Sequence, residues 1–388
     1  MKSLFDLSVV IVNYNVQYFL EQCILSIQAA SNNLKVEVIV VDNNSTDGSC
    51  KMLQEKFPEI QFIQNNINTG FSKANNQGVA LAKGEYVLVL NPDTIVAEDT
   101  FTKILDFAKT KPNLGILGVK LIDGAGNFLP ESKRGIPTPQ VSFNKLFGIS
   151  SKHTGKYYAA HLEENETGVV EILVGAFMLM KSAIYKEVHG FDEDYFMYGE
   201  DIDLSFKVLK KGYQNYYFAE TQVIHYKGES TKKDVKYLKY FHGAMKIFYR
   251  KHFKLNRVYD FLMSFGIEFW FLMKYFKFIQ FKENEHPVFN VLYFGKEEQI
   301  VNYLNKNYLL INESLLNDYE QIKEIIKNNN IDTIVFDNTT ITNKKIIEHF
   351  EVLKNERVSF KIHPRKTNFL IGSTSSLKRG QVELINQS

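Results

Sequence analysis

The sequence predicts an α/β protein with two separate α/β units. Two apolar runs, residues 8–12 and 36–41, are typical of buried parallel strands, and a helix-like stretch from Tyr18 to Ala30 separates them. A second alternation of strands and helices begins near residue 288. Because 388 residues exceed what one simple core normally holds, we expect at least two units.

Polar side chains follow the first two predicted strands where each strand ends. Asn13 and Tyr14 follow the first run, and Asp42 and Asn44 follow the second. Ligands of open α/β sheets bind at the carboxyl edge of the strands, so these groups suit a nucleoside. Capping of the next helix is the alternative, and it explains Ser45 adequately. It does not explain polar groups at two successive strand ends.

A third apolar run, residues 85–90, ends abruptly in Asn91-Pro92-Asp93. Pro92 lacks the amide hydrogen that a sheet needs and disfavours helix at Asn91, so the strand stops and presents Asp93 at its edge. Asn-Pro-Asp is also a common turn sequence, which is the alternative. The edge position makes Asp93 a candidate ligand for a cation.

A second acidic site comes later in the chain. Glu200, Asp201 and Asp203 stand at the start of a predicted helix, directly after Tyr198-Gly199. Clustered carboxylates raise one another's pKa, so a fold normally separates them unless one accepts a proton or holds a cation. An acidic first turn favoured by the helix dipole is the alternative. Combined with the strand-end carboxylate upstream, the cluster indicates an enzyme.

Five ordered segments resemble the family 2 glycosyltransferases of the GT-A fold, particularly their bacterial rhamnosyltransferase-like branch. The segments are residues 9–15, 40–48, 68–78, 90–94 and 174–207, and the resemblance covers roughly residues 5 to 250. It implies a mixed sheet flanked by helices in a catalytic domain of residues 1–230. It also implies inverting transfer of a sugar from a nucleotide-diphosphate sugar to an acceptor hydroxyl.

The resemblance assigns roles to individual residues. The nucleotide-binding set is Asn13, Tyr14, Asp42, Asn44, Asn68, Gly70, Asn75 and Asn91, and the donor or acceptor pocket contains Gly175, Ala176 and Lys227. Asp201 is the implied general base, since a carboxylate with an ordinary pKa is ready to accept a proton at neutral pH. Glu200 then orients the acceptor or tunes Asp201, and Asp203 lies on another helix face.

The departing diphosphate gains negative charge, which a bound divalent ion, Mg²⁺ or Mn²⁺, neutralises. Asp93 is the implied metal ligand, and His225 matches a position where some family members place a His on the metal or the diphosphate. Asn91 stands where the family's Asp-X-Asp has its first Asp, which leaves one fewer anionic ligand. A structural hydrogen bond is the alternative role of His225, and Lys227 is an alternative partner for the diphosphate.

Composition indicates an ordinary intracellular enzyme. With 46 basic and 44 acidic side chains the net charge is +2, which excludes a strongly basic surface, so we expect no nucleic-acid partner. Cys23 and Cys50 lack zinc-type spacing and are typical of a reducing compartment. The first residues lack a long apolar run, so we expect no secretory signal and a cytoplasmic location.

Residues 231–283 differ in character from the parts around them. Residues 232–250 alternate Lys with aromatic residues and predict a basic helix, and residues 258–281 are rich in Phe and contain the sole Trp270. Charged side chains interrupt the second run, so an interfacial helix on an anionic membrane is expected rather than a spanning one. Packing on the catalytic domain or on a partner chain is the alternative. Membrane contact suits a polyprenyl-linked acceptor and a peripheral location at the inner face of the cell membrane.

Residues 288–388 predict a small Rossmann-like α/β domain that ends in a polar tail after about Gly372. Only Gly295 stands where a dinucleotide fingerprint needs three glycines, so a docking or regulatory role is favoured over cofactor binding. Within the catalytic domain, residues 126–168 are the expected acceptor loop and contain Arg134 and His153.

Together these features predict a metal-assisted, inverting glycosyltransferase that acts on a lipid-linked or growing cell-envelope polysaccharide. The alternative is a catalytically silent protein on the same fold that binds nucleotide sugars or serves as a scaffold. Asn91 and the extra C-terminal domain favour the silent protein slightly. Asp93 together with Asp201 favours the enzyme, because a silent protein has no chemical need for a base that faces an acceptor.

Overall fold

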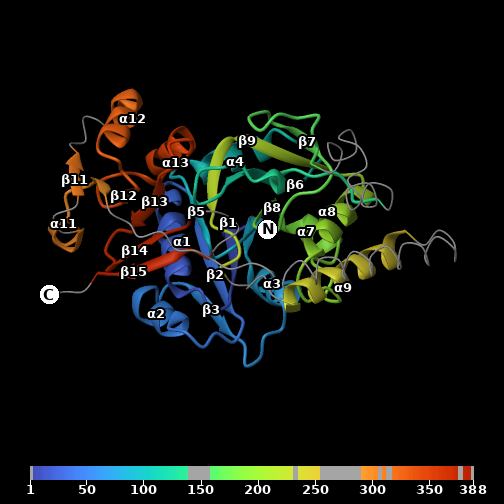
Figure 1. Ribbon diagram of the computed structural model, residues 1–388. Coiled ribbons are helices and arrows are strands. Elements are labelled where there is room, and N and C mark those ends of the chain that lie inside the picture. The colour runs from blue at the N-terminus through green and yellow to red at the C-terminus, as the bar shows by residue number, and fades with distance from the viewer. Residues whose placement is uncertain are drawn as a thin grey trace.

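The structure, a computed structural model, describes residues 3–138, 158–229, 235–253, 290–304, 308–311, 317–374 and 379–385. Figure 1 shows two units side by side, with helix α9 (Val235–His252) on the side of the first unit that lies away from the second. The predicted interfacial run 258–281 and His153 of the expected acceptor loop lie outside the described residues. In the described ranges, no helix combines the length and the apolar character needed to span a membrane.

The first unit is a mixed sheet flanked by helices, as the sequence predicts. The strand order is β3-β2-β1-β4-β8-β6-β9-β5, with β7 paired to β9. The strands are β1 (Phe5–Asn13), β2 (Val36–Asp42), β3 (Gln61–Gln64), β4 (Gly84–Leu90), β5 (Thr94–Val96), β6 (Leu114–Ile122), β7 (Gly168–Val170), β8 (Phe177–Lys181) and β9 (Gln214–His225). The helices besides α9 are α1 (Gln17–Ala30), α2 (Ser49–Lys56), α3 (Phe71–Leu81), α4 (Thr100–Lys109), η1 (Pro130–Ser132), α7 (Ser182–Glu187) and α8 (Glu200–Lys210).

The alternation of side chains along β1 explains why both faces of this sheet are covered. Leu7, Val9 and Ile11 pack against α1, α2 and α4, whereas Val10 packs in the cluster that contains residues of α3, α7 and α8. A strand that is apolar on both faces must lie between two helical layers. Strand β1 runs parallel to both β2 and β4, so the polar residues that end these three strands gather at one edge of the sheet.

The second unit contains a six-stranded sheet in the order β11-β10-β12-β13-β14-β15. The elements are β10 (Val291–Phe294), α11 (Glu298–Leu304), β11 (Tyr308–Ile311), α12 (Tyr319–Asn328), β12 (Thr333–Asp337), α13 (Asn343–Leu353), β13 (Ser359–His363), β14 (Phe369–Gly372) and β15 (Gln381–Leu384). The first four strands are parallel and the last two are antiparallel. The polar tail expected after Gly372 contains a further strand: residues 381–384 pair with β14, because backbone groups at a sheet edge accept a further strand whatever its side chains.

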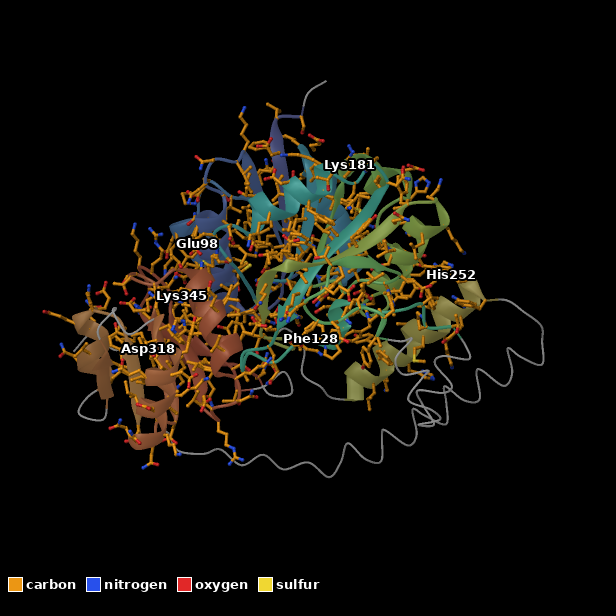
Figure 2. The ribbon with its side chains drawn as sticks, turned by 90° about the horizontal axis from the view of Figure 1, so that it is seen from above. Glu98, Phe128, Lys181, His252, Asp318 and Lys345 are labelled. Atoms are coloured by element: carbon orange, nitrogen blue, oxygen red, sulfur yellow. The ribbon has the colours of Figure 1, made fainter. Side chains whose placement is uncertain are left out.

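The two units share one hydrophobic cluster. Phe19 of α1, Ile95 of β5 and Ile224 of β9 pack in the same cluster as Phe350 and Ile371 of the second unit. Figure 2 labels Glu98 and Lys345 on the two sides of this boundary. Burial of apolar surface from both sheets holds the second unit against the α1 and β5 side of the first.

Polar contacts fix how the units meet. The Glu98 carboxylate accepts hydrogen bonds from the amides of Asn343, at 2.7 Å, and Lys344, at 2.9 Å. These amides begin α13, where no helical carbonyl is available to them and the helix dipole favours a negative charge. Elsewhere at the boundary, the buried Lys120 ammonium pairs with the Glu351 carboxylate. The second unit is thus anchored by a helix terminus and by a buried ion pair.

The Lys120–Glu351 pair yields a prediction about stability. Because the Lys120 side chain is only 1% exposed, the change Glu351→Ala leaves a buried ammonium without its main counter-charge. We expect the free energy of unfolding to fall by about 3 kcal/mol, the lower end for a broken buried pair, because Asn165 still accepts a hydrogen bond from Lys120. Urea unfolding measures the change. The control Glu320→Ala breaks an exposed pair with Lys323 and should have almost no effect; equal losses would contradict the prediction.

Candidate functional site

The carboxyl ends of β1 and β2 form one polar corner. Asn13 and Asp42 lie opposite each other in the parallel ladder, and the Asn13 Nδ2 group donates to Asp42 Oδ1 at 2.7 Å. The second Asp42 oxygen accepts from the Ser45 amide at 2.8 Å. Both side chains are fully buried, whereas Tyr14 is half-buried and Asn44 is exposed. Asn13 and Asp42 therefore form the buried base of the corner, and Tyr14 and Asn44 lie where a ligand can reach them.

Asn43, which stands between the predicted residues Asp42 and Asn44, organises the next loop. Its Nδ2 group donates to Asn68 Oδ1 at 2.9 Å, and its Oδ1 accepts from the Thr69 amide at 2.9 Å. Gly70 follows with φ +85°, and a Cβ there would lie 2.5 Å from the Phe196 carbonyl oxygen, so the position requires glycine. The amide of Phe71 donates to that same carbonyl at 2.8 Å. The predicted nucleotide loop is thus tied to the segment that leads to Glu200.

Asn75 lies deeper than the other predicted nucleotide residues. It is fully buried in α3, where its Nδ2 group donates to the Phe71 carbonyl at 2.9 Å. This hydrogen bond supports the first turn of α3, directly after Gly70. Asn75 is therefore buried within α3, and its side chain supports the loop that ends at Gly70.

Asn91, Asp93 and His225 come together at the ends of β4, β5 and β9. Strand β9 continues to His225, and this residue pairs with Thr94 of β5. The His225 Nε2 atom lies 3.4 Å from Asp93 Oδ1 and 3.3 Å from Asn91 Nδ2. All three side chains converge at the carboxyl edge of the sheet, where ligands of such sheets bind.

The donor set at this point fits a hard divalent cation that completes its shell with ligand oxygens. In the described part of the chain, no group of three or more His, Cys, Asp and Glu side chains forms a metal cluster. The Asn91 Oδ1 and His225 Nδ1 atoms are both buried and have no hydrogen-bond partner in the structure. Together with Asp93 they give one carboxylate, one amide and one imidazole, and both Mg²⁺ and Mn²⁺ accept such a partial set when phosphate oxygens and water supply the rest.

Two partners from other segments hold the Asp201 carboxylate. The Arg134 Nη2 group donates to Asp201 Oδ2 at 2.6 Å and to the Leu173 carbonyl at 3.0 Å. The amide of Gly175 donates to the same carboxylate oxygen at 3.2 Å. Tyr198 and Gly199, with φ of +71° and +80°, make the turn that brings α8 into this position. Arg134 belongs to the expected acceptor loop, and its position beside the carboxylate could not be read from the sequence.

Glu200 lies in a different electrostatic environment. Burial, followed by the charge of Asp201, raises the pKa of the Glu200 carboxyl to about 8. Its Oε2 atom is buried and has no hydrogen-bond partner in the structure. The two neighbouring carboxyls thus differ in their surroundings. The Arg134 guanidinium compensates the charge of Asp201 directly, whereas burial favours the protonated form of Glu200.

The backbone of Gly175 and Ala176 connects the two acidic sites. The amide of Asn91 donates to the Ala176 carbonyl at 3.0 Å, and the amide of Gly175 reaches Asp201. The strand end that carries Asn91 and Asp93 is therefore linked through this backbone to the Asp201 carboxylate. The sequence predicted Gly175 and Ala176 as pocket members, and the structure shows that their backbone binds Asn91 and Asp201.

Asp203 has a separate role in holding helix α9. Its side chain is only 1% exposed, and its Oδ1 atom lies 2.6 Å from the Nε2 atom of His252. The next residue back, Lys251, pairs with Asp192 at 2.5 Å and with Asp194 at 2.6 Å. The end of α9 thus fixes both α8 and the loop before it. A pairing between residues 49 positions apart leaves no local sequence signal.

Lys227 is already engaged by a carboxylate. Its ammonium pairs with Glu131, at η1, and although burial opposes the effect, this ammonium holds the pKa of the Glu131 carboxyl below its ordinary value. Lys227 has φ +65° and follows Tyr226, whose amide donates to the Asp93 carbonyl at 3.0 Å. Lys227 therefore lies on the loop that leaves the Asp93 site.

The mixed sheet flanked by helices and the two acidic sites, around Asp93 and around Asp201, are those of an α/β enzyme with a GT-A-like fold. The family model for glycosyl transferase family 2 matches residues 8–188. The chain is 30% identical over 242 residues to an N-acetylglucosaminyl-diphospho-decaprenol L-rhamnosyltransferase from Mycobacterium tuberculosis, covering 59% of this chain and 78% of that protein. This chain belongs to family 2 of the glycosyltransferases, and its predicted likeness to the rhamnosyltransferase-like branch is confirmed.

Two further proteins are similar. The rhamnosyltransferase WbbL from Escherichia coli K12 is 27% identical over 228 residues, covering 56% of this chain and 82% of that protein. A mannosyltransferase from Pyrobaculum calidifontis, solved in complex with GDP-Man and Mn²⁺, superposes with a TM-score of 0.45 at 17% identity, covering 69% of this chain and 70% of that one.

The raised pKa of Glu200 predicts a pH dependence of stability. Between about pH 4.5 and pH 8 the folded protein keeps a proton on Glu200 that the unfolded chain has released. Stability should therefore fall as pH rises through this window, and Glu200→Gln should remove part of that fall, because glutamine does not ionise. Urea unfolding at a series of pH values measures the difference between variant and wild type. Glu85→Gln, the same change at an exposed position of β4, is the control; equal slopes for all three proteins would contradict the prediction.

Proposed function

We propose that this glycosyltransferase moves a sugar, with inversion, from a nucleotide-diphosphate sugar to a hydroxyl of a lipid-linked or growing envelope polysaccharide. The observation that carries the proposal is the connection of the Asp93 site to the Asp201 carboxylate through the Gly175–Ala176 backbone. An inverting transfer needs a charged leaving group on one side of the anomeric carbon and a proton acceptor on the other. The backbone link between the two acidic sites supports the proposal that they serve one substrate pair.

The donor is proposed to lie along the edge formed by β1, β2 and β4. Asn13 and Asp42 form the floor for the nucleoside, Tyr14 and Asn44 are accessible, and the loop of Asn68 and Gly70 lies beside them. This arrangement directs the diphosphate toward Asn91 and Asp93, because β4 pairs with β1 in the same sheet. Parallel-sheet enzymes bind nucleotides in this way at their strand ends.

Asp93 and His225, with the amide oxygen of Asn91, are proposed to hold a divalent cation. Asp93 would supply the anionic ligand and the His225 imidazole a nitrogen ligand, while the backbone bond from Tyr226 keeps the 225–229 loop at the strand end. When bound, the cation supplies positive charge that stabilises the departing diphosphate. Lys227 is a second source of positive charge once it leaves Glu131.

Asp201 is proposed to be the general base. As the acceptor oxygen forms its bond to the anomeric carbon, the hydroxyl proton passes to the carboxylate and the bond from carbon to the diphosphate oxygen breaks. Arg134 and the Gly175 amide orient the carboxylate. Glu200, with its raised pKa, is the competing proton acceptor, because a base is most effective when its pKa lies near the working pH.

The lipid-linked acceptor rests on a relative and on the composition of the chain. The M. tuberculosis relative is named for a decaprenol-linked acceptor, and residues 258–281 of this chain have the composition of an interfacial helix. We propose a peripheral position at the inner face of the cell membrane, where a polyprenyl-linked acceptor is presented.

The base assignment predicts the effect of Asp201→Asn. We expect turnover to fall by roughly 10² to 10⁴ with donor affinity nearly unchanged, because this is the usual contribution of a positioned general base. Release of nucleoside diphosphate from a panel of nucleotide sugars, with an acceptor and with Mn²⁺, measures turnover. Glu200→Gln is the matched comparison: a collapse of activity in that variant with activity retained in Asp201→Asn would assign the proton to Glu200.

The cation assignment predicts the effect of Asp93→Ala. We expect weaker binding of both Mn²⁺ and nucleoside diphosphate in calorimetry, because the variant loses the one anionic ligand of the proposed set. Asp123→Ala removes a buried carboxylate that accepts hydrogen bonds within its own turn and controls for general disturbance of strand ends. Full activity of the wild type in excess chelator would contradict metal assistance.

The membrane assignment predicts binding to anionic vesicles. Each Lys or Arg near the surface adds about 1 kcal/mol, a contribution that salt screens, so the protein should sediment with the vesicles at low salt and be partly released at high salt. The triple change of Phe269, Trp270 and Phe271 to Ser should abolish sedimentation. If neither the wild type nor the triple variant sediments with vesicles, the membrane assignment is contradicted, and packing of residues 258–281 on protein is favoured.

A further inference from the structure

The 225–229 loop, which carries His225 and Lys227, is an unusual turn. Lys227 and Gly228 have φ values of +65° and +87°, so two successive residues adopt the left-handed conformation. For a residue with a side chain this conformation costs free energy, and it persists only where surrounding contacts determine it. The start of the loop is held by the bond from the Tyr226 amide to the Asp93 carbonyl. The end of the loop must be held by other contacts.

Those contacts come from the second unit. Glu229 is only 3% exposed, and its Oε1 atom accepts a hydrogen bond from the Gly380 amide at 2.6 Å. The Arg379 Nη2 group donates to the Glu229 carbonyl oxygen at 2.7 Å. Both the side chain and the backbone of Glu229 are therefore bound by two adjacent residues that precede β15.

Packing shows that this approach is close. A Cβ at Gly380 would lie 2.4 Å from the Phe19 Cζ atom and 3.1 Å from Glu229 Oε1, so only glycine lets the chain pass here. The Phe19 ring meets the Tyr226 ring edge-on, with 5.2 Å between centroids. The residues on either side of Lys227 and Gly228 are thus held between α1 and the second unit.

The pairing of β15 fixes the segment that makes these contacts. Gln381, directly after Gly380, lies opposite Gly372 of β14, and β14 pairs with β13 in the second sheet. The position of Arg379 and Gly380 is therefore set by the second sheet as a whole. The contact of Arg379 and Gly380 with Glu229 is separate from the contact between Glu98 and the start of α13.

We propose that the second unit completes the donor site: Arg379 and Gly380 position the 225–229 loop through Glu229 and so set how His225 and Lys227 meet the diphosphate. The inference rests on the proposed function, in which this loop serves the diphosphate. It gives the second unit a role inside the active site, in place of the docking or regulatory role expected from its sequence. Glu229, Arg379 and Gly380 are positioning residues, because they act on the ligand through His225 and Lys227.

The test compares variants that touch the loop with one that does not. Glu229→Ala and Arg379→Ala remove contacts to the loop, Glu229→Gln keeps an acceptor oxygen for the Gly380 amide, and Glu98→Ala loosens the second unit without touching the loop. Calorimetry with uridine and thymidine diphosphate in Mn²⁺ gives donor-site affinity, and initial rates give KM for donor and acceptor separately. Urea unfolding reports the stability of each variant.

We expect Glu229→Ala to weaken nucleoside diphosphate binding about fivefold to tenfold, the effect of losing one hydrogen bond, with acceptor KM unchanged. Arg379→Ala, at an exposed side chain, should act in the same direction with stability nearly intact, and Glu229→Gln should restore most of the affinity. Glu98→Ala should lower stability while leaving affinity at the wild-type value. A loss of affinity in Glu98→Ala equal to that in Glu229→Ala would overturn the proposal.

Asp93→Ala separates failure of this inference from failure of the proposed function. If Asp93→Ala loses nucleotide affinity while Glu229→Ala and Arg379→Ala keep it, the donor site stands and the positioning role is rejected. If none of these variants changes affinity, the donor site itself is misplaced and the positioning role falls with it.

Discussion

The buried ion pair between Arg134 and Asp201 is the interaction on which the arrangement of the candidate site depends. The Asp201 side chain is only 12% exposed, and a carboxylate so far from water requires a compensating charge and hydrogen bonds. Arg134 supplies both, and its second bond, to the Leu173 carbonyl, joins the 126–134 segment to the start of the glycine segment. Three stretches of chain that are far apart in sequence are thereby fixed around one carboxylate.

From this pair the constraints extend to the donor side through backbone bonds. The amide of Gly175 reaches Asp201, the carbonyl of Ala176 receives the amide of Asn91, and the carbonyl of Phe196 receives the amide of Phe71 at the nucleotide loop. These backbone hydrogen bonds join the Asp201 carboxylate, the Asn91 strand end and the Gly70 loop into one framework. Helix α9 stabilises this framework from one side through His252 and Asp203, and the second unit does so from the other through Glu229.

Much of the fold was predictable because it follows from local pattern. Strands β1 and β2 contain the apolar runs predicted at residues 8–12 and 36–41, since each run is continuous and ends in polar residues. Strand β15 was missed because it lies in a polar stretch, and its strand conformation comes from backbone pairing with β14, which the side-chain pattern does not signal. The same limit applied to the site: strand ends predicted Asp42 and Asp93, whereas Arg134 could be assigned to Asp201 only from three-dimensional contacts. The roles of the site residues remain predictions.

The central claim is that one edge of the first sheet holds the donor diphosphate beside the acceptor-facing carboxylate. The most direct measurement is a crystal structure of the protein with Mn²⁺ and the nucleoside diphosphate that it binds most tightly. The account predicts the metal ion on Asp93 and His225, the nucleoside against the Asn13 and Asp42 corner, and the terminal phosphate directed toward the Asp201 side of Gly175. A nucleotide bound at the strand ends of the second unit, or a metal ion away from Asp93, would contradict it.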